Sequence, residues 1–122
     1  MIEIHVKDMR FPLLLDAYGA VLTERKRELL DYYYNEDYSL SEIAELTGLS
    51  RQGARDGIRK AEEELRSLED SLSLVRITET VSEIADSLSV LAAEAGEGRI
   101  SDGIRDAVRK LTSLRPPDLS KE

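Results

Sequence analysis

The chain of 122 residues contains no cysteine, no tryptophan, one histidine, one phenylalanine and five tyrosines. Without cysteine it forms no disulfide and no thiolate metal site. With so few aromatic residues, a core must be built mainly from Leu, Ile, Val and Ala, which suits packed helices. The composition therefore predicts a helical protein of a reducing, cytoplasmic compartment.

Long apolar runs and catalytic groups are also missing. No apolar stretch approaches the ~20 residues that a membrane helix needs, and residues 1–7 lack the pattern of a signal peptide, so no membrane insertion is expected. There is no pair of His ligands, no nucleophile beside a base and no Gly-rich phosphate loop. The sequence predicts a protein that is not an enzyme and that needs no metal and no cofactor.

Positive charge is scarce. The chain has 17 Lys and Arg residues and 25 Asp and Glu residues, which gives a net charge of −8. A molecule of that charge is repelled by a phosphate backbone at long range. The cations nevertheless gather in two places. One is the run Arg25, Lys26, Arg27, and the other comprises Arg51, Arg55, Arg59 and Lys60. The local field of these two stretches, rather than the total charge, decides what binds there.

The first residues alternate between apolar and polar side chains, with Ile2, Ile4 and Val6 on one side. Alternation of this kind is typical of a strand. The rest of the chain offers no partner strand. Residues 1–9 are therefore predicted to form a flexible or subunit-bridging arm.

Helical spacing begins near Arg10 and predicts a first helix that reaches about Val21. Thr23 is placed to cap a second helix, whose Leu29, Leu30 and Tyr33 would face the core. Residues 35–38 form a polar turn. Two of the four tyrosines at positions 32, 33, 34 and 38 are expected in the core, although exposed tyrosines can also stack on unpaired RNA bases.

A helix-turn-helix is the strongest motif of the sequence. Ser39 and Glu42 have the spacing of a capping box, which opens a short helix. Gly48 ends that helix, because glycine adopts the left-handed conformation at little steric cost. Ser50 then caps a new helix almost at once. A short helix, a tight turn and a second helix predict a helix-turn-helix.

Two apolar stripes follow the motif, the first from Ile58 to Val75 and the second from Ile77 to Ala95. They differ in phase by about 200° of helix rotation. Either the helix stays continuous and buries a different face at each end, or it breaks and folds back. We favour a break between Val75 and Thr78, with Thr78 as the cap of the next helix. A loop at Gly96 and Gly98 precedes a last helix, which Ser101 would cap.

The last helix carries Ile104, Ala107, Val108 and Leu111 and is expected to stop before Pro116 and Pro117. The predicted organisation is an all-α protein with a helix-turn-helix domain over 10–66, a long helical extension over 67–115 and a disordered tail over 116–122. The apolar stripes of the extension need another surface to cover them. The simplest such surface is a second copy of the chain, so we expect a homodimer formed by the helices after Leu65.

The second helix of the motif exposes a polar face that could bind nucleic acid. Arg donates two hydrogen bonds to guanine, Gln pairs with adenine, and a helix N-terminus binds phosphate through its free N–H groups. The candidate residues are Ser50, Arg51, Gln52, Arg55, Arg59 and Lys60, with Arg25, Lys26 and Arg27 placed to meet backbone phosphate. An ordinary solvated charged face, or a protein-docking face, is the alternative.

Gly53 and Gly57 lie four residues apart inside this helix, where each costs about 1 kcal/mol relative to Ala. Their spacing strips one side of the helix of side chains. A bare face permits close approach of another backbone, from protein or nucleic acid. The alternative is a mildly unfavourable helix that packing holds in place.

Four segments together resemble the YlxM family of bacterial proteins. They are Leu14–Gly19, Leu22–Arg27, Asp37–Glu45 and Leu49–Gln52. More distantly, Leu22–Arg66 is similar to the helix-turn-helix of sigma factor region four. Arg51, Gln52, Asp56 and Ile58 match the YlxM pattern, whereas Gly53, Ala54, Arg55 and Gly57 depart from it.

This resemblance implies a cytoplasmic helical protein with a nucleic-acid-binding module. It also implies a role in the signal recognition particle pathway, with contacts to the particle's small RNA and to its GTPase. Two hypotheses follow. The first is a regulator that binds RNA or DNA, with signal recognition particle RNA favoured. The second is a protein-interaction module that modulates a GTPase without touching nucleic acid.

Overall fold

A computed structural model describes residues 7–114, and every regular element in that range is helical. The predicted all-α class is therefore confirmed. The alternating residues Ile2 to Val6 of the predicted arm, and the predicted tail, lie outside the described residues. The elements are α1 Arg10–Tyr18, η1 Gly19–Val21, α2 Glu24–Leu30, η2 Asp31–Asn35, α3 Leu40–Thr47, α4 Arg51–Leu72, α5 Leu74–Glu94 and α6 Arg99–Thr112.

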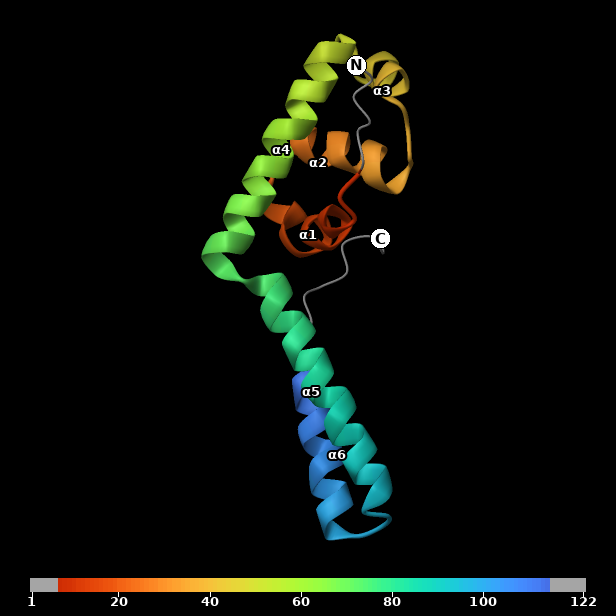
Figure 1. The fold of residues 1–122 in the computed structure, drawn as a ribbon, viewed down its shortest axis with the longest axis vertical. Helices are drawn as coiled ribbons and strands as arrows, with labels where there is room; N and C mark the ends of the chain where they lie inside the picture. The colour runs from red at the N-terminus through yellow and green to blue at the C-terminus, as the bar shows by residue number, and fades with distance from the viewer. Residues whose placement is uncertain (1–6, 115–122) are drawn as a thin grey trace, which may run out of the picture. The chain divides into compact units, whose positions relative to one another are not determined.

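The chain divides between Leu72 and Ser73 into two compact units. Among the described residues, unit 1 comprises residues 7–72 and holds α1 to α4, and unit 2 comprises residues 73–114 and holds α5 and α6 (Figure 1). The first unit thus extends beyond position 66, because α4 continues without interruption to Leu72.

Local signals set the ends of the helices of unit 1. The Thr23 hydroxyl accepts a hydrogen bond from the Lys26 amide, and the capping box of Ser39 and Glu42 has both of its bonds. Gly48 has φ of 76° and ends α3 in the left-handed conformation. These caps satisfy backbone groups that a helix end leaves without partners. The predicted boundaries of the motif are therefore confirmed.

The core of unit 1 lies where α1, α2 and α3 pack against α4 (Figure 1). Its large apolar side chains are almost fully enclosed, and they are spaced along each helix so that one face turns inward. The completely buried large ones are Phe11, Leu29, Leu30, Ile43 and Leu65. Unit 1 therefore has a closed core of its own. Burial of each of these side chains contributes about 1.5–3 kcal/mol to the free energy of folding.

Between α2 and α3 the helix widens into one π-helical turn, η2. Tyr33 is buried there, and the hydroxyl of the half-buried Tyr34 donates a hydrogen bond to the buried carboxylate of Glu62. The ammonium group of Lys7 lies over the Tyr33 ring and binds both the Tyr33 carbonyl and the Asp37 carboxylate. Lys7, in the predicted arm, is thereby tied to unit 1.

Unit 2 is a hairpin in which α5 and α6 run antiparallel and pack along their length (Figure 1). The residues that it buries most deeply are small: Ala85, Ala92 and Ser101. Glycines 96 and 98, both with positive φ, form the connecting turn. Small residues between the helices let the two backbones approach closely, and the larger side chains Leu74, Leu88, Ile104 and Leu111 are only half-buried.

Two predictions about unit 2 were wrong. The break before α5 lies at Ser73, which has φ of 55°, and Thr78 lies inside α5, where its hydroxyl donates to the Leu74 carbonyl. The last helix begins at Arg99 rather than at Ser101, which is 1 % exposed. Ser101 is therefore a small residue for helix packing and caps nothing.

Candidate nucleic-acid interface

The helix-turn-helix comprises α3, the turn at Gly48 and Leu49, and the beginning of α4. Ser50 caps α4 through its hydroxyl, which accepts a hydrogen bond from the Gly53 amide at 2.9 Å. Ile43, Ala54 and Ile58 are buried between the helices of the motif. This packing fixes which side of α4 turns outward.

Three arginines lie along that outward side, and we call Arg51, Arg55 and Arg59 the α4 ridge. All three are exposed. Residues four apart on a helix lie on one side and are separated by about 6 Å along the axis. The ridge therefore presents three guanidinium groups in a line that begins at the N-terminus of α4, where the helix dipole adds positive potential.

Two predicted residues beside the ridge already have partners. The amide of Gln52 donates to the Asp56 carboxylate at 2.9 Å, and the Ser50 hydroxyl is used in the cap. Gln52 must give up the bond to Asp56 before its amide can read a base edge. The N–H groups at the start of α4, together with Arg51 and Arg59, are thus better placed for an anion than Gln52 or the Ser50 hydroxyl.

The basic run of α2 does not form one patch. Arg25 donates to the Thr47 carbonyl at the end of α3, and Lys26 forms an ion pair of 2.7 Å with Glu64 of α4. Arg27 is exposed, and its aliphatic stem lies near Gly19. Consecutive helix residues are rotated by about 100°, which is why the three diverge. Lys60 is exposed as well but lies about 100° around α4 from Arg59.

The two glycines of α4 have different surroundings. A Cβ atom at Gly57 would lie 2.6 Å from Cδ1 of Leu29, so the Leu29 side chain of α2 fills the space that a side chain at position 57 would need. At Gly53 the nearest atoms belong to Ser50 and Leu49, three and four residues earlier in the chain. The space at Gly57 is therefore taken by a side chain of the protein's own α2 and not by another backbone.

The segment before the α4 ridge is acidic. No Lys or Arg occurs between Arg27 and Arg51, and that stretch carries six carboxylates. On α3, Glu42 and Glu45 are exposed. The lack of cations in this stretch is visible in the sequence, but it does not enter the site that the sequence predicts. The α4 ridge thus stands beside a surface that repels phosphate.

The tyrosines are divided between core and surface. Burial raises the pKa of Tyr33, and burial together with the hydrogen bond to Glu62 raises the pKa of Tyr34. The half-exposed rings of Tyr32 and Tyr38 lie 5.6 Å apart, and they stand among the carboxylates of the acidic segment. That setting does not favour stacking on a nucleic-acid base, because each base brings its phosphate.

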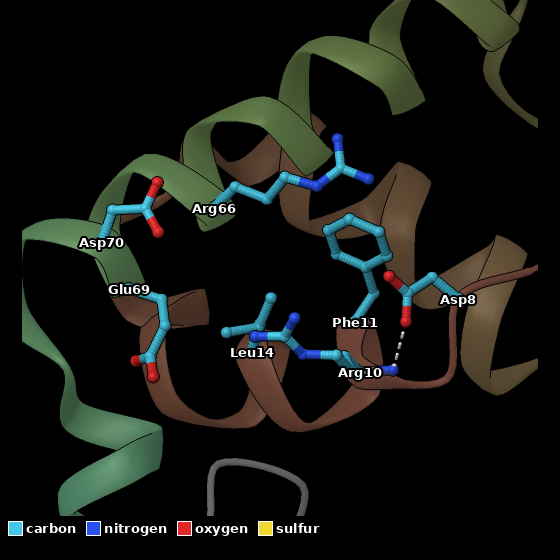
Figure 2. A pocket seen from close by; sticks show the side chains of 7 residues that line it. All are labelled: Asp8, Arg10, Phe11, Leu14, Arg66, Glu69 and Asp70. Carbon is cyan, nitrogen blue, oxygen red and sulfur yellow. Dashed lines mark hydrogen bonds between the residues drawn. The ribbon is translucent and has the colours of Figure 1, made fainter.

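A cavity of about 120 Å³ opens at the other end of unit 1, between α1 and α4 (Figure 2). The guanidinium of Arg66 lies 4.9 Å above the centre of the Phe11 ring, and Arg10 borders the cavity from the opposite side. Asp8, Glu69 and Asp70 also line it, and Glu69 accepts a hydrogen bond from Tyr18. With three carboxylates against two guanidiniums, the cavity does not select an anion.

Within residues 7–114, no group of His, Asp and Glu side chains is arranged to hold a metal ion. None of the described helices is long and apolar enough to cross a membrane.

A family model described as "Putative helix-turn-helix protein, YlxM / p13 like" matches residues 5–100 of the chain. A UPF0122 protein of Thermoanaerobacter pseudethanolicus is 36 % identical over 108 residues, which cover 85 % of this chain and 92 % of that protein. A UPF0122 protein of Clostridium kluyveri is 45 % identical over 75 residues, 62 % of this chain and 68 % of the other. The match to the family model includes α3, the turn and all of α4.

Proposed function

Because the chain belongs to the UPF0122 family of YlxM/p13-like helix-turn-helix proteins, we propose that it is a non-catalytic, nucleic-acid-binding regulator. The observation that carries this proposal is the α4 ridge, three exposed arginines in line directly after the turn of the motif. A row of guanidinium groups at a helix N-terminus fits the phosphates of a nucleic acid. The proposed location is the cytoplasm, and no cofactor takes part.

The preferred nucleic acid is RNA. When a helix-turn-helix binds duplex DNA, its first helix crosses the backbone. In this protein that helix is α3, which exposes Glu42 and Glu45 and carries no cation. Repulsion along α3 leaves the α4 ridge as the contact. A narrow contact suits an RNA loop or bulge better than a long duplex.

The RNA that we propose is that of the signal recognition particle, and the support for it is the resemblance to the YlxM family described above. The GTPase of the particle is a proposed second partner.

To test the RNA contact, Arg51 and Arg59 are both replaced by Glu, and binding to signal recognition particle RNA is measured in a filter or mobility assay. Arg55 is left in place because its charge acts on Tyr33 of the core. Affinity is expected to fall about tenfold or more, and the slope of log affinity against log salt by about 2. The matched control is Arg10→Glu, set against Arg59→Glu alone, because it alters the net charge equally at an exposed site of α1 at the other end of unit 1.

Equal losses in the ridge variant and the control would mean that total charge, and no particular surface, governs binding. Unchanged binding by the ridge variant would remove the proposal. Tighter binding to a duplex DNA of equal length than to the RNA would replace RNA by DNA as the target.

The second candidate function is a protein-interaction module that modulates a GTPase without touching nucleic acid. The acidic stretch between Arg27 and Arg51 and the net charge of −8 favour it, because such a surface attracts a basic protein. The GTPase should then co-purify with the protein even after nuclease treatment. Loss of the GTPase on treatment with nuclease would show that RNA bridges the two.

We also propose that the protein acts as a homodimer through the helices of unit 2, as the apolar stripes of the sequence indicate.

A further inference from the structure

Unit 2 leaves one side of α5 apolar and uncovered. Ile77, Ile84 and Leu91 follow one another at intervals of seven residues and are 53 %, 47 % and 51 % exposed. Seven residues are close to two turns, so the three side chains share one side of the helix. This side borders the face that packs on α6, where Ala85 and Ala92 are buried.

A matching row runs along α6 and into the turn that follows it. Ile100 and Ala107 lie in α6 and Leu114 lies two residues after its end, again at intervals of seven, and Ile100 and Leu114 are 74 % and 70 % exposed. Among the described residues of unit 2, these two rows contain all exposed large apolar side chains except Val90.

Both rows lie on the same side of the hairpin. Ile77 and Leu114 line one shallow groove of about 70 Å³ between α5 and α6. Both helices rise by about 1.5 Å per residue and run in opposite directions. From Ile77 and Leu114, steps of seven bring Ile84 level with Ala107, and Leu91 level with Ile100. The hairpin thus presents three apolar layers on one side.

A second copy of the same hairpin is the occupant that this side fits. Two-helix hairpins that each bury one side against the other make a four-helix bundle. The helices differ in charge: α5 carries four acids and one cation, which gives −3, and α6 carries four cations and two acids, which gives +2. A copy that sets its α6 on the first copy's α5 therefore joins opposite charges, whereas α5 on α5 would join like charges.

We propose that two copies of this chain pair through the rows 77/84/91 and 100/107/114, with α5 of each copy against α6 of the other. This inference rests on the homodimer proposed above and specifies its geometry. The twofold axis then runs parallel to the helices. In the dimer, Ile77 of one copy packs on Leu114 of the other, Ile84 on Ala107, and Leu91 on Ile100. Each apolar layer therefore contains residues from both copies at the same height along the bundle.

This geometry has a consequence for the attachment of unit 1. With a twofold axis parallel to the helices, the N-termini of both α5 helices lie at the same end of the bundle. Each α5 is joined through Ser73 to a unit 1 of its own. Both copies of unit 1 are therefore attached at the same end of the bundle, whereas an axis perpendicular to the helices would attach them at opposite ends.

The surface is tested by the mass of the full chain in solution, measured by sedimentation at micromolar concentration without nucleic acid. The wild type is expected at twice 13.7 kDa and Ile84→Asp at 13.7 kDa, because a buried carboxylate without a partner opposes pairing. Val90→Asp is the matched control, since Val90 is 57 % exposed on α5 outside the row, and it should remain a dimer. A monomeric wild type overturns the homodimer, and a dimeric Ile84→Asp overturns this surface.

Charge reversal tests the geometry without altering the apolar rows. Glu83 and Lys110 flank the rows of α5 and α6 and lie within about 3 Å of the same level along the helix axes. Glu83→Lys is expected to weaken the dimer, and Glu83→Lys combined with Lys110→Glu to restore it. Failure of the double variant to restore the dimer would overturn the pairing of α5 with α6 while leaving the nucleic-acid proposal intact.

Discussion

Units 1 and 2 are both helical, but they bury their side chains differently. Unit 1 encloses Phe11, Leu29, Leu30, Ile43 and Leu65, each at most 1 % exposed. The apolar residues that unit 2 buries fully are two alanines, whereas Leu74, Leu88, Ile104 and Leu111 are half-buried and Ile77, Ile84 and Leu91 are exposed. Large apolar side chains are thus fully enclosed in the first unit, and none is fully enclosed in the described part of the second.

The difference lies in the number of helices that surround the core. Four helices surround one core in unit 1 and enclose its large apolar side chains, although Met9, Leu13, Val21, Leu46 and Leu72 remain exposed. Two helices alone can cover only one side of each other. Unit 1 therefore has an enclosed core, whereas the apolar side that unit 2 leaves uncovered is the one we propose to pair with a second copy.

The largest expected effect separates the two units directly. Leu65→Ala leaves a cavity in the closed core and is expected to lower the free energy of unfolding of unit 1 by about 2–5 kcal/mol. Ile84→Ala, in unit 2, should change it by less than about 0.5 kcal/mol. All five tyrosines lie in unit 1, so tyrosine fluorescence during urea denaturation follows that unit alone. Equal losses in the two variants would contradict the contrast between the units.

A smaller effect is expected from adding one methyl group to each unit. Gly57→Ala brings a Cβ to 2.6 Å from Leu29 and should destabilise unit 1 by about 1–3 kcal/mol. Gly103→Ala, in α6, meets no atom within 4 Å and should stabilise unit 2 by up to about 1 kcal/mol. Thermal unfolding followed by circular dichroism and by tyrosine fluorescence distinguishes the two. Stabilisation by Gly57→Ala would show that α2 does not approach α4 so closely.

The smallest effect concerns the buried polar pair of unit 1. Tyr34→Phe removes the hydrogen bond to Glu62 and should cost about 1 kcal/mol at neutral pH. Because the folded state raises the pKa of Tyr34, its contribution is complete below the unfolded pKa of 10.0 and is lost as pH rises through the folded pKa. Stability should therefore fall less between pH 9 and 11 in Tyr34→Phe than in the wild type. Tyr38→Phe is the control, and an identical alkaline decline in Tyr34→Phe and the wild type would refute this linkage.

Those features of the fold that depend on near neighbours in the chain were predictable. The bonds of Thr23, of Ser39 with Glu42, and of Ser50 join residues three apart, and Gly48 ends a helix by its own conformational freedom. The position of the break before α5 was not predictable. The phase difference between the two stripes shows only roughly where the break must lie. The left-handed residue is Ser73, and serine is not a residue type that favours this conformation.

The candidate site shows the same division. Arg51, Arg55 and Arg59 were found from their spacing, because residues four apart share a helix side whatever the helix packs against. The spacing could not show that Lys26 pairs with Glu64, which is 38 residues away, or that Gln52 is held by Asp56. These contacts depend on how α2 lies against α4 and on which rotamer each side chain adopts.

The order of the amino acids settles the class of the protein, the helix-turn-helix and the line of arginines that leaves it, since caps, turns and periodicity act over a few residues. Packing alone decides which cations remain exposed and which apolar side chains find no cover. Those outcomes arise where helices distant in sequence meet, as at Gly57, where the Leu29 side chain of α2 fills the space beside α4.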